Sequence, residues 1–179
     1  MSLSGTGAAP DLYFEDLEPG LSFDLGVTEV DGAEMVAFAR RFDPQWYHVD
    51  EALAAESAYG APIASGLYTL SLFMRAYVDG VLSQAAAAAS PGLEEVRWTA
   101  PVYAGDRLTT LLRVVDRGLS RARPGFGTVV LTATMTRLGA DGEPEDDVLR
   151  LRFRGWFARR SHEATPADPA SPADPRPTG

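Results

Sequence analysis

The stretch from Leu67 to Ser83 constrains the fold most, because it is apolar nearly all the way round a helix. A helix on the surface of a protein keeps a polar face, whereas a helix that is apolar on every side has to be buried. Ser65 and Gly66 come directly before this stretch, and both are common residues at the beginning of a helix. The sequence therefore predicts one long buried helix around which the rest of the chain packs.

Strand patterns follow this helix. Threonines alternate with apolar residues over 128–136, and arginines alternate with leucine and phenylalanine over 149–154. A period of two is typical of a strand with one buried face. Residues 139–146 predict the hairpin between these strands, and residues 94–100 and 107–116 predict two more strands. One buried helix followed by antiparallel strands that can wrap it is an α+β arrangement.

The part of the chain before the buried helix predicts a strand and a short helix. Residues 23–27 alternate between apolar and other residues. Asp31, with Glu34 three residues later, resembles a capping box that opens a helix whose apolar face reaches Phe42. The helix has to end at Asp43, because a residue that precedes a proline is disfavoured in the α region.

Composition divides the 179 residues into one domain and two flexible ends. Hydrophobic residues make up 45% of the chain, which is enough for a substantial core. Residues 161–179 contain five of the 13 prolines and no large apolar residue, so burial cannot offset the entropy of ordering them. We therefore expect a flexible N-terminus over 1–11, a single domain over 12–160 and a flexible tail over 161–179.

Charge and residue usage exclude several classes of function. A net charge of −9 and a pI near 4.7 argue against binding to nucleic acid or to an anionic membrane surface. The absence of cysteine excludes disulfides, thiolate metal sites and cysteine nucleophiles. No apolar run reaches the roughly 20 residues that a membrane-spanning helix needs. The N-terminus has neither the basic nor the apolar region of a secretory signal, so a cytoplasmic location is expected.

His48 is the only histidine in the predicted domain, because the second one, His162, lies in the polar tail. His48 follows Asp43 by five residues, in a segment that leaves a helix at a proline. A carboxylate and an imidazole in one bent segment can converge on a single water molecule. General acid–base chemistry on water needs such a pair, because one group removes a proton while the other delivers one.

Residues 43–48, Asp-Pro-Gln-Trp-Tyr-His, resemble the Asp-x-Asn-Pro-x-His motif of the MaoC-like hydratase family. Residues 63–69 and 97–106 are similar to later segments of the same family, and the resemblance spans roughly residues 12–158. Gln45 stands where the family often has asparagine, and Trp46 stands where it often has proline. The amide is therefore kept with a longer reach, while a rigid position is replaced by a large ring.

The resemblance implies a hotdog fold, in which a curved antiparallel sheet wraps one long helix. It also implies the reversible hydration of a 2-enoyl thioester of coenzyme A or of an acyl carrier protein. In that reaction Asp43 would act as the base toward water and His48 would share the water and supply a proton. The Gly66 amide, at the positive end of the buried helix, would stabilise charge on the thioester oxygen. Ser65 would hold Asp43 or cap the helix, and Gln45 would contribute to substrate binding.

No metal and no cofactor is expected for this chemistry. A single curved sheet also leaves an open edge, so we expect at least a homodimer that joins at such an edge. Hotdog relatives generally place the thioester near the boundary between subunits, which the resemblance implies here too.

Each of these residues also has a simpler interpretation. Asp43 before a proline can be an ordinary turn residue, and His48 can be a hydrogen-bonded surface residue. Ser65 can be a helix cap alone, and Gly66 can be a turn residue alone. An arginine row on 149–154 can hold the phosphates of coenzyme A or form a solvated face balanced by carboxylates.

Two other functions remain open for the same fold. A hotdog acyl-CoA thioesterase also needs a carboxylate and a bound thioester, but it does not require a histidine at this spacing. A non-catalytic protein that binds acyl thioesters would not need the pair of Asp43 and His48 at all. The presence of both residues favours the hydratase.

Overall fold

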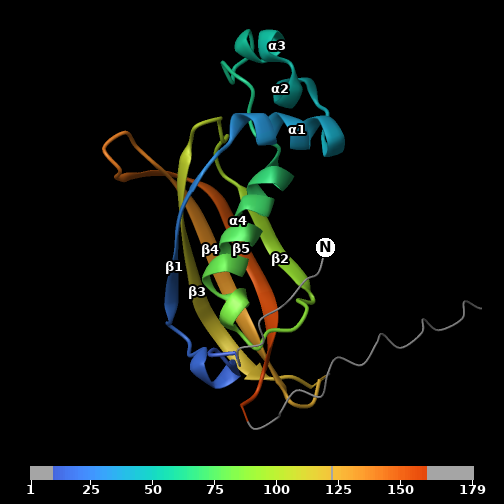
Figure 1. Cartoon of the computed structure of the whole chain (residues 1–179), viewed down its shortest axis with the longest axis vertical. Helices are drawn as coiled ribbons and strands as arrows, with labels where there is room; N and C mark the ends of the chain where they lie inside the picture. The colour runs from blue at the N-terminus through green and yellow to red at the C-terminus, as the bar shows by residue number, and fades with distance from the viewer. Residues whose placement is uncertain (1–9, 122, 161–179) are drawn as a thin grey trace, which may run out of the picture.

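A computed structural model describes residues 10–121 and 123–160 of the chain. A five-stranded antiparallel sheet carries helix α4 across one face, while helices α1, α2 and α3 sit together beyond one end of the sheet (Figure 1). The strand order is β1-β3-β4-β5-β2. The elements are η1 (Phe14–Asp16), β1 (Ser22–Glu29), α1 (Gly32–Phe42), α2 (Trp46–Val49), α3 (Glu51–Ala55), α4 (Gly66–Gly80), η2 (Leu82–Gln84), β2 (Gly92–Trp98), β3 (Arg107–Leu119), β4 (Phe126–Leu138) and β5 (Pro144–Ala158).

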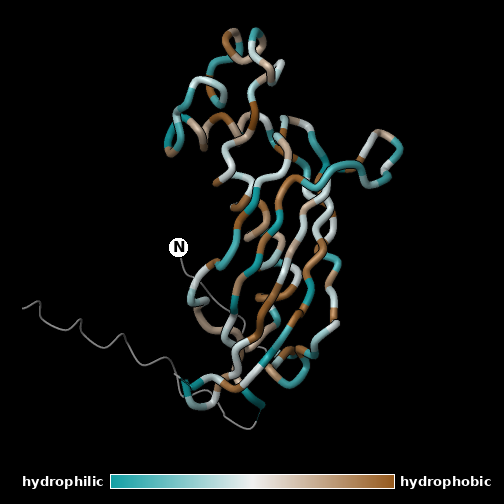
Figure 2. Tube along the Cα trace, turned by 180° about the vertical axis from the view of Figure 1, so that it is seen from behind, coloured by the Kyte–Doolittle hydropathy of each residue, from teal (hydrophilic) through white to brown (hydrophobic). Residues whose placement is uncertain are grey.

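Helix α4 lies in the core, as the apolar stretch predicts. Phe73 is completely buried, and its ring stacks on Tyr77 at a centroid distance of 5.8 Å. Both rings form T-shaped pairs with Phe153 on β5, with centroids 5.7 and 5.4 Å apart. Hydrophobic residues recur along the strands of the sheet, as Figure 2 shows, and buried ones from β3, β4 and β5 belong to the same cluster as Phe73 and Tyr77. The predicted α+β fold, a curved sheet around one long helix, is confirmed.

The strand predictions from alternating residues are also confirmed. The β4–β5 hairpin pairs Thr132 with Arg152 and Thr134 with Arg150, so these polar side chains share the outer face of the sheet. Both strands extend well beyond the alternating segments. The extension is possible because hydrogen bonds between strands do not depend on side-chain polarity, and bulges accommodate the irregular ends.

Complete burial of α4 is a wrong prediction. Leu67, Met74 and Val78 are 50%, 45% and 39% exposed, so one face of the helix is open. The sheet covers only one side of the helix, and the described residues supply no second layer over the other side. Phe42 is likewise 58% exposed, although the pattern of α1 places it on the apolar face.

Local signals succeed at the ends of the short helices. Asp31 accepts a hydrogen bond from the Glu34 N–H at 2.8 Å, which caps α1. The Glu34 side chain does not complete the capping box, because it accepts a hydrogen bond from the Tyr68 hydroxyl at 3.0 Å. Burial, together with the Glu34 carboxylate, raises the pKa of Tyr68, so the hydroxyl stays protonated and ties α1 to α4.

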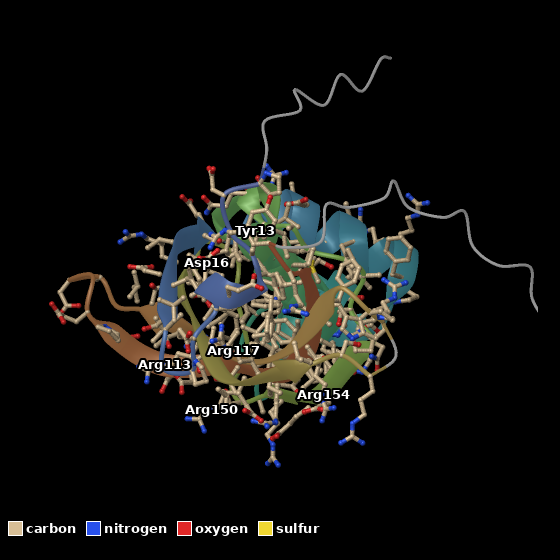
Figure 3. The ribbon with its side chains drawn as sticks, turned by 90° about the horizontal axis from the view of Figure 1, so that it is seen from below. Tyr13, Asp16, Arg113, Arg117, Arg150 and Arg154 are labelled. Atoms are coloured by element: carbon tan, nitrogen blue, oxygen red, sulfur yellow. The ribbon has the colours of Figure 1, made fainter. Side chains whose placement is uncertain are left out.

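The end of the sheet opposite α1–α3 is closed by η1. The Phe14 ring lies so close to Gly127 that a Cβ there would sit 2.0 Å from a ring carbon, so a glycine is needed. Arg117 holds the backbone of this segment by donating to the Phe14 and Glu15 carbonyl oxygens, each at 2.9 Å. Figure 3 shows Tyr13, Asp16 and Arg117 at this closed end.

The arginine row on β5 lies on the outer face of the sheet, with Arg150 and Arg154 pointing away from the helical layer in Figure 3. Arg150 pairs with Asp147 at 2.7 Å, and both Arg152 and Arg154 pair with Glu94. The simpler interpretation of this row, a face balanced by carboxylates, agrees with these pairs. The expected tail over 161–179 and most of the expected flexible N-terminus lie outside the described residues, so both domain boundaries stay predictions.

Candidate active site

Asp43 is the residue at which α1 stops. Its backbone N–H still bonds to the Ala39 carbonyl at 2.8 Å, but its φ and ψ of −151° and 64° have left the helical region. The chain then turns at Pro44, and the Gln45 N–H donates back to the Asp43 carbonyl at 2.8 Å. This tight turn leaves the Asp43 side chain at the open end of the helix, beside α2 and the beginning of α4.

His48 lies on α2, a one-turn helix that the sequence patterns did not predict, and its side chain is 5% exposed. Its Nδ1 is 2.7 Å from the Ile63 carbonyl oxygen. Because a carbonyl can only accept, Nδ1 carries a proton, and Nε2 is the nitrogen turned toward the carboxylate. Nε2 lies 3.3 Å from Asp43 Oδ2. The two predicted acid–base groups are therefore in direct contact.

Ser65 has both of the roles that were left open for it. Its hydroxyl donates to Asp43 Oδ2 at 2.7 Å, and the same oxygen accepts from the Leu67 N–H at 3.3 Å, which caps α4. Hydrogen bonds from Ser65 and Gln45 and the nearby His48 hold the pKa of Asp43 below its ordinary value. Asp43 is thus ionised at neutral pH. Ser65 itself is fully buried and does not line the pocket described below.

Gln45 connects Asp43 to Tyr47. The Gln45 Nε2 donates to Asp43 Oδ1 at 2.8 Å, and the Tyr47 hydroxyl donates to Gln45 Oε1. Tyr47 also packs edge-on against His48, with ring centroids 4.4 Å apart. Gln45 and His48 therefore contact the Asp43 carboxylate directly, and Tyr47 is connected to it through Gln45.

Gly66 is the first residue of α4, and its carbonyl accepts from Trp98 Nε1 at 2.8 Å. A Cβ at this position would lie 2.6 Å from the indole ring, so a glycine is needed for this contact. Within 10–121 and 123–160, no oxygen accepts a hydrogen bond from the Gly66 N–H. An N–H at the beginning of a helix is available to an anionic or polarised oxygen.

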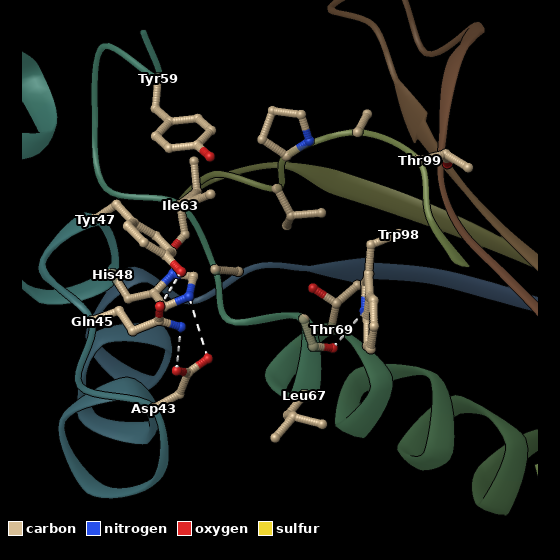
Figure 4. Close-up of a pocket in the computed structure, with 15 residues that line it drawn as sticks. Asp43, Gln45, Tyr47, His48, Tyr59, Ile63, Leu67, Thr69, Trp98 and Thr99 are labelled. Atoms are coloured by element: carbon tan, nitrogen blue, oxygen red, sulfur yellow. Dashed lines mark hydrogen bonds and ion pairs between the residues drawn. The ribbon is translucent and has the colours of Figure 1, made fainter. Parts of the chain in front are cut away.

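These groups surround a cavity of about 580 Å³, drawn in Figure 4. Its wall is mostly apolar away from the acid–base pair, and none of the described residues that line it is a lysine or arginine. The lining residues are Asp43, Gln45, Tyr47, His48, Tyr59, Ile63, Ala64, Gly66, Leu67, Thr69, Trp98, Thr99, Ala100, Pro101 and Val102. An apolar chain with a polar group near Asp43 and His48 fits such a wall.

Sequence reasoning singled out Asp43, Gln45, His48 and Gly66, and the structure brings all four to this cavity. It missed Tyr47 and Trp98 as residues of the site, although both stand inside the segments that carry the family resemblance. Trp46 does not line the cavity; its ring borders a separate hollow with Leu53. The large ring that replaces the family's proline is therefore not part of the acid–base site.

The described residues contain no cluster of three or more histidine, cysteine or acidic side chains that could hold a metal ion. Over the same residues, no helix is both long and apolar enough to cross a membrane. The polar groups that meet at the cavity include a carboxylate, an imidazole and the N-terminus of α4.

A curved antiparallel sheet around one long helix defines the hotdog fold, and Asp43 and His48 meet beside the N-terminus of that helix. The chain matches the family model described as "MaoC like domain" over residues 18–136. It belongs to the MaoC-like dehydratase family.

Relatives agree with this membership. The chain is 32% identical to a 3-hydroxybutyryl-CoA dehydratase of Methylorubrum extorquens, over 82% of this chain and 96% of that protein. It is 30% identical to the uncharacterized protein YdeM of Bacillus subtilis, over 68% of this chain and 86% of that one. The crystal structure of a MaoC-like dehydratase from Rhodospirillum rubrum superimposes with a TM-score of 0.70 at 34% identity, covering 83% and 98% of the two chains.

Proposed function

We propose that this protein interconverts a 2-enoyl thioester and a 3-hydroxyacyl thioester, with Asp43 and His48 acting on one water molecule. The observation that carries the proposal is the contact of Asp43 Oδ2 with His48 Nε2 at 3.3 Å. Both residues line the cavity that Gly66 also lines. A relative with 32% identity is named as a 3-hydroxybutyryl-CoA dehydratase, which supports the same reaction class here.

In the hydration direction Asp43 acts as the base and His48 as the acid. Asp43 accepts one proton from water while the water oxygen bonds to C3 of the enoyl group. The electrons of the C2–C3 double bond move toward the thioester oxygen, where the Gly66 N–H and the positive end of α4 stabilise the negative charge. His48, carrying a proton on Nε2, delivers it to C2. The proton on Asp43 then returns to His48 across their direct contact, which restores both groups.

Hydrogen bonds from neighbouring groups keep the pair in the required states. The Ile63 carbonyl fixes the His48 ring with Nε2 toward Asp43. Ser65 is buried behind Asp43 and donates to it, so we assign Ser65 the role of orienting the base. The acyl chain would lie along the apolar wall, and its carrier would be coenzyme A or an acyl carrier protein.

The test is a spectroscopic assay with crotonyl-CoA and longer enoyl thioesters, which follows enoyl absorbance and free thiol in parallel. Loss of enoyl absorbance with formation of the 3-hydroxyacyl product and no free thiol is the expected result. Release of thiol without the hydroxy product would instead make the protein a thioesterase. Binding of the thioester with neither change would make it a non-catalytic acyl-thioester-binding protein.

We also infer that two copies associate along strand β2. This strand is an edge of the sheet, and it exposes Leu93 and Trp98. The open face of α4, with Leu67, Met74 and Val78, offers further apolar surface. Such surface and an unpaired edge are both covered when a second copy pairs across a two-fold axis. Light scattering at micromolar concentration should give a particle of twice 19.2 kDa or more, and a monomer alone would refute the inference.

A further inference from the structure

We propose that Tyr47 and Gln45 form a hydrogen-bonded relay that positions the Asp43 carboxylate for its reaction with water. The proposal rests on the proposed function. It gives a role to Tyr47 and changes the role of Gln45 from substrate binding to positioning of Asp43. The relay has two links: Tyr47 hydroxyl to Gln45 Oε1, and Gln45 Nε2 to Asp43 Oδ1 at 2.8 Å. Figure 4 shows the three side chains in a row at one side of the cavity.

The chemistry of the groups fixes the direction of both links. Asp43 is ionised, and a carboxylate can only accept, so the amide nitrogen of Gln45 has to face it. The amide oxygen of Gln45 then faces Tyr47, whose hydroxyl has to donate. The orientation of the Tyr47 hydroxyl is therefore transmitted to Asp43 through one amide group.

The length of the glutamine side chain makes the relay possible. Gln45 is held near Asp43 by the backbone hydrogen bond across Pro44, and Tyr47 lies one residue before His48 on α2. An asparagine at position 45 would be shorter by one carbon–carbon bond, about 1.5 Å. Such a side chain could reach one of the two partners but not bridge them. The departure from the family's asparagine thus coincides with a tyrosine that uses the longer reach.

The relay complements the contacts on the other carboxylate oxygen. Asp43 Oδ2 accepts from Ser65 at 2.7 Å and lies 3.3 Å from His48, whereas the relay occupies Oδ1. With both oxygens held, the carboxylate plane cannot rotate freely, and Oδ2 stays aligned with His48 Nε2. Displacement of a reacting group by 1 Å can reduce a rate by about a hundredfold.

The relay also predicts a dependence on pH. The titratable or charged side chains of the helices around Asp43 are Glu34, Arg40 and Arg41 in α1, Tyr47 and His48 in α2, and Tyr68, Arg75, Tyr77 and Asp79 in α4, and Tyr59 lines the same cavity. Of these described groups, His48 alone forms an ion pair with Asp43. The donors that favour the ionised carboxylate are then Ser65, Gln45 and His48, in that order. Removing the Gln45 donor should raise the Asp43 pKa, and removing Tyr47 should raise it less.

The experiment compares Gln45→Leu, Tyr47→Phe and the double variant with the wild type. The acid limb of the plot of kcat/KM against pH should move to higher pH in Gln45→Leu and, by a smaller step, in Tyr47→Phe. We expect kcat to fall by between about tenfold and a hundredfold in Gln45→Leu. Because Tyr47 acts through Gln45, the double variant should be no worse than Gln45→Leu alone, which is the signature of coupled residues. Tyr13→Phe removes a hydroxyl at the opposite end of the molecule and serves as the matched control.

A second readout does not depend on turnover. The side-chain carboxyl carbon of Asp43, assigned by its loss in Asp43→Asn, can be titrated by NMR in 13C-aspartate-labelled wild type and variants. An unchanged Asp43 titration in Gln45→Leu, or additive effects in the double variant, would overturn the relay. If the titration moves as expected while the wild type hydrates no enoyl thioester, the relay stands and the proposed function fails.

Discussion

The two halves of helix α4 show how one element serves two purposes. Around Phe73 and Tyr77 the face of the helix that meets the sheet is enclosed by aromatic and aliphatic side chains, and its contacts are non-directional; this part of α4 is called the enclosed half. At Ser65 and Gly66 the same helix begins among polar groups whose contacts are hydrogen bonds of defined direction. We therefore expect stability to depend mainly on the enclosed half, and the proposed chemistry to depend on the polar end.

This difference predicts that substitutions separate into two groups. Changes at the polar end should reduce turnover and leave the free energy of unfolding nearly unchanged. Changes in the enclosed half should reduce the free energy of unfolding and leave the turnover of the remaining folded molecules nearly unchanged. Turnover and the free energy of unfolding therefore both have to be measured for every variant.

The largest effect is expected at the acid–base pair. Asp43→Asn and His48→Gln approximate the original shapes, and each should reduce enoyl hydration by about 10²–10⁴-fold, the usual range for a general acid–base group. Because the two groups act on one water, the double variant should lose little more than the worse single variant. Circular dichroism should show an intact fold in all three. A rate close to that of the wild type in either single variant would remove that residue from the mechanism.

The next effect concerns stability in the enclosed half. Phe73→Ala removes a ring that is completely buried, and truncations of this kind cost about 3–5 kcal/mol. Phe73→Leu leaves a smaller cavity and should cost less, which gives a folded variant if the alanine does not fold. Urea unfolding measures the change. A loss of turnover in folded Phe73→Leu as large as that in the Asp43 variant would contradict the separation of the two halves.

Gly66→Ala tests the polar end of α4. The new methyl group would lie 2.6 Å from the Trp98 indole, so the ring has to move away from the start of α4. We expect kcat/KM to fall by up to about a hundredfold, because the oxygen-binding N–H and the cavity wall shift together. The double variant Gly66→Ala/Trp98→Ala removes the clash and should recover part of the rate. No recovery would mean that the methyl group blocks the substrate itself.

The smallest effect is expected on the outer face of the sheet. Arg150, Arg152 and Arg154 form exposed ion pairs with Asp147 and Glu94, and pairs of this kind contribute about 0–1 kcal/mol each. Replacing each arginine by glutamine should therefore change the free energy of unfolding by no more than this amount. The KM for a coenzyme A thioester should stay the same. A clear rise in KM would revive the alternative that this row binds the carrier's phosphates.

Where sequence patterns failed, the reason lies in contacts between distant segments. Val27 belongs to an alternating stretch and yet is more than half exposed, because the chain bulges at Gly26, which has a φ of 78°. Phe42 lies on the apolar face of α1 and is exposed, because α1 sits beyond the end of the sheet (Figure 1) and Phe42 is its last residue. Neither outcome is visible in a local pattern, since the exposure of Val27 depends on the register of the β1–β3 pairing and that of Phe42 on where the sheet ends.

The sequence alone determined the order and type of the main elements and singled out Asp43 and His48 as the candidate acid–base pair. Alternation over 128–136 and 149–154, the apolar stretch from Leu67 and the proline after Asp43 act through backbone geometry over a few residues, so they can be read locally. The spacing of Asp43 and His48 is equally local.

Only the tertiary structure decided how that pair is held. Ser65 reaches Asp43 across 22 residues, and the Ile63 carbonyl sets the proton on His48 across 15. Trp98 closes on Gly66 from 32 residues away. These contacts form because the sheet places α4 and β2 beside the end of α1, and hydrogen bonds need that placement to within a few tenths of an ångström.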